Sequence, residues 1–137
     1  MLLLDNKTSY SFKIDLLQKI ANSLTNKDIE LILVDDLEIK KINKKYRNID
    51  KPTDVLSFPF KDTPGAILGI IVISLDQALM GAKRFGHSID DEIALLFIHG
   101  ILHLLGYDHE IDDGQMRKKE EEIIKKFNLP KSLIIRT

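Results

Sequence analysis

The sequence predicts a layered α+β (α/β) fold with about four short strands and about five helices. Short β-branched runs typical of strands alternate along the chain with longer apolar stripes at helical spacing. The chain has 137 residues, 44% of them hydrophobic and 30% charged, which suits one globular domain spanning residues 1–137. No repeat, low-complexity tract or linker-like segment indicates a second domain.

The first part of the chain alternates between strand and helix patterns. Strands are expected at residues 2–4, 30–34 and 55–60, and a helix at residues 12–24. Asp35 or Asp36 can cap a second helix. The inward side of that helix is expected to comprise Leu37, Ile39, Ile42 and Tyr46. Pro59 predicts an edge position for the third strand, because proline has no N–H to donate to a sheet.

The rest of the chain contains one strong strand pattern and three helix patterns. Residues 68–74 form an apolar, β-branched run that predicts a central strand covered on both faces. A helix over residues 76–85 should stop at Gly86, and Ser88 opens a capping box for a long apolar helix. A last helix starts near residues 112–115. Its expected inward residues are Met116, Ile123, Ile124 and Phe127.

Three of the four histidines form a pattern that suits one metal ion. His99 and His103 are four residues apart, so on a helix they differ by ~40° around the axis and ~6 Å along it. Both imidazoles then reach one cation at ~2.0–2.1 Å. Gly106 can end the helix in the left-handed conformation and return His109 to the same ion. Three imidazoles leave a tetrahedral zinc one vacant position, as in catalytic sites.

Neighbouring residues narrow the chemistry of this motif. Extended zinc peptidases have a glutamate general base after the first histidine, whereas Gly100 stands here, which argues against a peptidase. Asp108 has two possible roles. It either orients or deprotonates a water molecule bound to the metal, or it holds the His109 ring in position. His87 lies outside the pattern and is interpreted as an ordinary loop residue. Zinc is the expected ion, although nickel or copper also suit imidazole ligands.

Charged residues are distributed unevenly along the chain. The net charge is −1, but residues 38–51 contain six basic residues against two acidic ones. This segment either binds phosphates or forms a solvated helix face. Acidic residues toward the C-terminus balance it: Asp112, Asp113, Glu120, Glu121 and Glu122.

With no cysteine, no apolar run of transmembrane length and no basic leader, a cytoplasmic location is expected.

A second distinctive segment joins the histidine motif. It runs from Asn43 through Arg47 to Pro52-Thr53-Asp54-Val55-Leu56-Ser57-Phe58-Pro59. Together with His99-Gly100-Ile101-Leu102-His103-Leu104-Leu105-Gly106-Tyr107-Asp108-His109, this segment closely resembles the YbeY family of bacterial rRNA maturation factors. The resemblance extends in order from Asn43 to Glu122.

The resemblance implies a metal-dependent endoribonuclease that acts on single-stranded RNA. It further implies processing of 16S rRNA 3′ ends, small-subunit maturation and ribosome quality control, with a ribosome-associated GTPase and a small-subunit protein as partners. Neither DNA nor a membrane is an expected partner. The implied fold is a small mixed sheet flanked by helices. One zinc ion held by His99, His103 and His109 is implied, and the family's functionally important arginine corresponds to Arg47.

We therefore expect Arg47 to reach a backbone phosphate, with Lys44 and Lys45 binding RNA phosphates nearby. The alternative role for Arg47 is a surface ion pair with Asp50 or Asp54. Either water or the RNA's own 2′-hydroxyl is the nucleophile.

Ile70 stands where the family usually has aspartate, and that carboxylate either supports the site or has a structural role. Two other functions stay open: a zinc hydrolase of small phosphoesters, and a non-catalytic assembly module stabilised by zinc.

Overall fold

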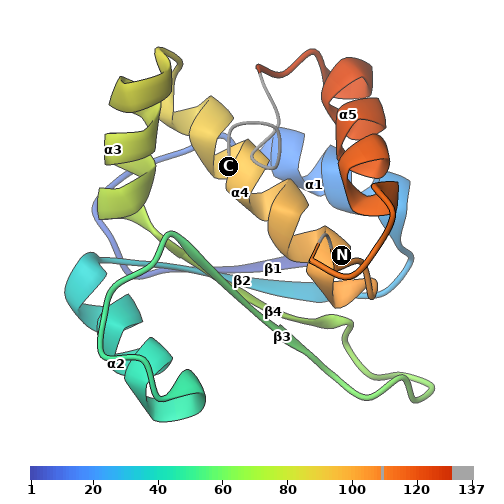
Figure 1. The fold of residues 1–137 in the computed structure, drawn as a ribbon, viewed down its shortest axis with the longest axis horizontal. Coiled ribbons are helices and arrows are strands. Elements are labelled where there is room, and N and C mark those ends of the chain that lie inside the picture. Colours follow the sequence, from blue (N-terminus) through green and yellow to red (C-terminus); the bar gives the residue numbers. More distant parts are fainter. Residues whose placement is uncertain (109, 131–137) are drawn as a thin grey trace.

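The computed structural model describes residues 1–108 and 110–130 (Figure 1). It contains four strands and five helices within these residues, as the sequence predicts. The strands are β1 (Leu2–Asn6), β2 (Ile29–Val34), β3 (Val55–Pro59) and β4 (Gly69–Ser74). The helices are α1 (Ile14–Leu24), α2 (Asp36–Arg47), α3 (Leu75–Phe85), α4 (Ile89–Leu104) and α5 (Gln115–Phe127).

The four strands form one mixed sheet in the order β1-β2-β4-β3. β1, β2 and β4 are parallel, whereas β3 is antiparallel to β4 and lies at the edge. The edge position predicted from Pro59 is therefore confirmed, with Pro59 opposite Gly69. The sheet carries α1, α3, α4 and α5 on one side and α2 on the other (Figure 1).

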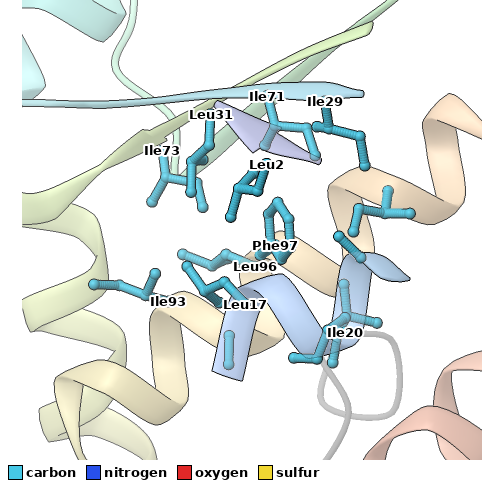
Figure 2. Close-up of a cluster of buried hydrophobic side chains, with 14 of the residues drawn as sticks. Leu2, Leu17, Ile20, Ile29, Leu31, Ile71, Ile73, Ile93, Leu96 and Phe97 are labelled. Carbon is cyan, nitrogen blue, oxygen red and sulfur yellow. The ribbon is translucent and has the colours of Figure 1, made fainter. Parts of the chain in front are cut away.

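Helix α4 is the centre of the main core. Eleven of its residues are buried, because the sheet lies on one side of it and the other helices on the rest. Figure 2 shows side chains of α1 and α4 packed beneath those of β1, β2 and β4. Alternate strand residues such as Ile29, Leu31, Ile71 and Ile73 face this layer, each with no exposed surface. The histidine-bearing helix is therefore held rigidly against the sheet.

Helix α2 corrects one prediction about inward residues. Ile39 is fully buried and Ile42 packs beside it, but Leu37 is 64% exposed and Tyr46 is 63% exposed. Leu37 lies two residues from Ile39, about 200° around the helix, and so points away from the sheet. The Tyr46 ring only touches the edge of Phe58, with centroids 5.5 Å apart. The polar side chain of Asn43 occupies the inward side instead, 3% exposed.

No helix among the described residues has the length and apolar character needed to cross a bilayer.

Candidate active site

The C-terminal half of α4 brings two of the predicted ligands together. The Nε2 atoms of His99 and His103 lie 3.1 Å apart, and the ring centroids 4.6 Å apart. Two nitrogens bound tetrahedrally to zinc at 2.0–2.1 Å would be separated by about 3.3–3.4 Å. The two imidazoles therefore fit a shared divalent cation closely. Histidine nitrogens are also donors that zinc prefers.

The chain reverses directly after α4, as predicted from Gly106. Gly106 has a φ of +97° and its N–H donates to the carbonyl of His103. The N–H of Tyr107 donates to the carbonyl of Leu102, so the last turn is closed by two hydrogen bonds. This reversal returns Asp108 to the cleft beside the histidines.

His109, the predicted third ligand, lies outside the described residues. Within residues 1–108 and 110–130, no group of three His, Cys, Asp or Glu side chains has the arrangement of a metal site. Two of the three predicted ligands are thus placed side by side, and the third stays a prediction.

A cleft of about 430 Å³ opens beside the two imidazoles. Its walls come from the end of α2, from β3 and the residue before it, and from α4 with the loop that follows. The lining residues are Arg47, Asp54, Val55, Ser57, Pro59, His99, His103, Asp108 and Glu110. One guanidinium, two imidazoles and three carboxylates therefore share one solvent-accessible cavity, a combination suited to phosphate and metal chemistry.

Arg47 reaches the cleft because α2 ends at this residue. Asn48 adopts the left-handed conformation, with a φ of 57°, and its N–H donates to carbonyls of α2. The Asn43 side-chain amide donates to the carbonyl of Lys51 at 2.9 Å, which ties the returning chain to the helix. Asn43 thus holds the turn after α2, while Arg47, four residues later, lies at the cleft.

The surface ion pair considered for Arg47 is not formed with any described carboxylate. Asp50 instead lies 4.0 Å from the ammonium groups of Lys40 and Lys44. Lys44 and Lys45 are exposed on α2, and the Lys45 ammonium lies 5.2 Å from the centroid of the Tyr46 ring. Arg47 is therefore the member of the basic segment that lines the cleft, while the two lysines flank it on α2.

Strand β3 divides its residues between two faces of the sheet. Val55, Ser57 and Pro59 face the cleft. The Ser57 hydroxyl donates to the carbonyl of Gly100 at 3.3 Å, and the Thr53 hydroxyl donates to Asp54 at 3.4 Å. Both hydroxyls thus have structural partners within the protein.

The direction of the Ile70 side chain shows where the aspartate that is usual in the family would lie. Its side chain lies in an apolar groove on the α2 side of the sheet, with Ile32 and Phe58. The neighbouring Ile71 faces α4 and the main core. Because successive strand residues point to opposite faces, position 70 is directed away from the histidines. A carboxylate there would lie on the other side of the sheet from the cleft.

Gly100 has a packing role at the position where zinc peptidases carry glutamate. A Cβ atom on Gly100 would lie 3.0–3.3 Å from three side-chain atoms of Ile71. A side chain at position 100 would therefore require the buried Ile71 to shift by a few tenths of an ångström. A glutamate at this position would crowd the same contact between α4 and β4.

Gly100→Ala is expected to destabilise the fold by about 1 kcal/mol. Overpacking costs about 1–3 kcal/mol, while alanine gains about 1 kcal/mol in helix propensity over glycine. Denaturant unfolding measures the change. In an Ile71→Val background, which removes one crowding carbon, the same substitution should cost less. An equal or larger cost in that background would contradict the packing explanation.

His87 lies away from the cleft, in keeping with its exclusion from the metal pattern. It follows α3, and its Nε2 is 2.6 Å from Oε1 of Glu92 in the first turn of α4. Both side chains are nearly buried, so His87 is a structural partner of Glu92 and not a simple exposed loop residue.

Glu120 is the site residue that the sequence interpretation missed. The sequence places it among the acidic residues that balance the basic segment, but its side chain has no exposed surface. Its Oε2 lies 3.7 Å from Nδ1 of His99, behind the cleft. Its burial could have been predicted from the sequence, because position 120 falls within the helical stripe of Met116, Ile123 and Ile124.

Comparisons with known proteins identify the family of this chain. A family model described as Endoribonuclease YbeY matches residues 5–128. The chain belongs to the YbeY family. Proteins named Endoribonuclease YbeY match it along nearly the whole length of both chains. The relative from Nautilia profundicola is 67% identical over 96% of this chain and 95% of its own length. The relative from Sulfurimonas denitrificans is 57% identical over 97% and 96% of the two chains.

A solved structure supports the fold of this YbeY-family chain. The solution structure of TM1509 from Thermotoga maritima matches with a TM-score of 0.65 and 28% sequence identity. The match covers 93% of this chain and 89% of that one. The mixed four-stranded sheet with flanking helices is thus shared with that protein.

Proposed function

We propose that this chain is a zinc-dependent endoribonuclease that cleaves single-stranded RNA. The observation that carries the proposal is the cleft in which Arg47 lies with two imidazoles whose Nε2 atoms are 3.1 Å apart. Relatives that are 67% and 57% identical are named endoribonucleases, which supports the reaction class. The family resemblance extends the proposal to 16S rRNA 3′-end processing, small-subunit maturation and ribosome quality control in the cytoplasm.

The residues of the cleft have separate tasks in this reaction. A divalent cation held by His99 and His103, with His109 as the predicted third ligand, would supply Lewis acidity toward a phosphate oxygen. Arg47 binds the scissile phosphate through parallel N–H donors and stabilises negative charge on its non-bridging oxygens. Asp54, Asp108 and Glu110 offer carboxylates that can accept the proton of the nucleophile.

Metal analysis and RNA cleavage together test the proposal. Purified protein should contain about one zinc per chain and cleave a single-stranded 16S rRNA fragment. A chelator should stop cleavage, and added zinc should restore it. A 5′-phosphate on the products indicates attack by water, whereas a 2′,3′-cyclic phosphate indicates attack by the 2′-hydroxyl.

The same assay distinguishes the two alternative functions. Turnover of short phosphodiesters without RNA cleavage would identify a small-molecule phosphoesterase. Zinc that raises the melting temperature of a protein inactive on both substrates would identify a non-catalytic assembly module.

Lys44 and Lys45 are expected to contribute to RNA affinity more than to the chemical step. Lys44→Ala and Lys45→Ala should each raise KM with little change in kcat. Each should also reduce the slope of log affinity against log salt by about 0.7, the value for one phosphate contact with a single strand. Titration of labelled RNA at several salt concentrations measures this, with Lys119→Ala on α5 as the control. A flat salt dependence of the wild type would contradict a basic RNA-binding face.

A further inference from the structure

A buried carboxylate approaches His99 from the side opposite its partner histidine. Nε2 of His99 faces His103 at 3.1 Å, while Nδ1 lies 3.7 Å from Oε2 of Glu120. Glu120 comes from α5, a separate helix that packs on α4. One nitrogen of the ring is thus directed to the candidate metal position, and the other to a carboxylate inside the protein.

The surroundings of Glu120 fix the place of this carboxylate. Its neighbours on the same helix face, Met116 and Ile123, are 0% and 3% exposed and belong to the main core. Burial of a carboxylate is costly unless positive charge or hydrogen-bond donors lie close by. A divalent cation on the histidines would add positive charge near this carboxylate, and the Nδ1–H group of His99 would be a donor directed toward it.

We propose that Glu120 is a positioning residue for the metal centre, accepting a hydrogen bond from Nδ1–H of His99. This bond holds His99 in the tautomer whose bare Nε2 is presented to the metal. Metal-bound histidines commonly donate their second N–H to a carboxylate, which fixes the ring and raises its basicity. Closing the separation from 3.7 Å to a hydrogen bond needs a shift of about 0.8 Å. The inference rests on the proposed function, because it requires His99 to bind metal.

The same helix supplies matched controls. Glu121 lies 3.3 Å from Nε of Arg117, and Glu122 lies 3.7 Å from the ammonium of Lys119. Glu122 is 59% exposed, so its replacement changes the charge of α5 by the same amount without reaching His99. Glu122→Gln therefore separates the effect of charge from that of position.

The experiment measures zinc affinity of the full chain by competition with a chromogenic chelator. Glu120→Gln should weaken zinc binding by about 10-fold and Glu120→Ala by up to about 100-fold, while Glu122→Gln matches the wild type. Nitrogen-15 spectra of the imidazoles provide a second readout in the metal-free protein. His99 should carry its proton on Nδ1 in the wild type and lose this preference in Glu120→Ala.

The outcomes separate this inference from the proposed function. If the wild type binds zinc and both Glu120 variants bind it equally well, Glu120 has no positioning role and the nuclease proposal stands. A lower melting temperature with unchanged zinc affinity would likewise reduce Glu120 to a packing residue. If the wild type binds no zinc, both proposals fail. Should Glu120→Ala not fold, the near-isosteric Glu120→Gln decides.

Discussion

His103→Ala is expected to lower the rate of RNA cleavage by about a thousandfold or more. The substitution removes one of two imidazole nitrogens that lie 3.1 Å apart in the cleft. A catalytic metal ion contributes several kcal/mol of transition-state stabilisation, and each 1.36 kcal/mol corresponds to a factor of about ten in rate. Single-turnover cleavage of labelled RNA measures the loss, with zinc content determined on the same sample.

His87→Gln is the control for this variant. His87 lies at the other end of α4, where its Nε2 contacts Glu92 at 2.6 Å, and glutamine can keep a hydrogen bond there. Zinc content and cleavage should match the wild type. Full activity of a zinc-free His103→Ala protein would remove the metal from the proposed mechanism.

Arg47→Ala should reduce kcat by about 10²–10³-fold and leave the zinc content unchanged. Loss of one preorganised charge-stabilising donor has an effect of this size in other enzymes. Arg47 lines the cleft with the two imidazoles, but it contributes no nitrogen to the metal. Arg47→Lys should recover part of the rate, because lysine keeps the charge and loses the forked geometry. Cleavage under saturating RNA gives kcat directly.

Arg117→Ala serves as the matched arginine variant. Arg117 is exposed on α5, where it pairs with Glu121, and its loss should leave kcat and KM as in the wild type. An Arg47→Ala protein that changes only KM would show that Arg47 binds RNA without assisting the chemical step. Added zinc should not restore the activity of Arg47→Ala, because this variant keeps its metal ligands.

Local features of the site could be predicted from the sequence because each depends on a short stretch of chain. The i, i+4 spacing of His99 and His103 follows from helix geometry alone. The left-handed turn at Gly106 follows from the freedom of glycine, and the caps at Asp35 and Ser88 follow from their side-chain oxygens. Pro59 identified the edge strand for a similarly local reason.

Features that depend on packing between distant segments could not be predicted. The residues near Glu120 in the sequence do not predict that α5 packs behind His99. The exposure of Tyr46 depends on how α2 crosses the sheet, and the outward direction of Ile70 depends on strand register. From the sequence, Gly100 indicates only that the glutamate of zinc peptidases is absent. The reason for glycine there, close contact with Ile71, requires the sheet.

The strand order also determines when the cleft can first exist during synthesis. β3 precedes β4 in the chain, yet among the described strands β4 is the one it pairs with, so this pairing cannot form until β4 has been made. The histidines of α4 emerge later still. A nascent polypeptide on the ribosome therefore cannot assemble the complete cavity from its early portion. Formation of the cavity therefore requires synthesis at least as far as the loop after α4, because Asp108 and Glu110 line it.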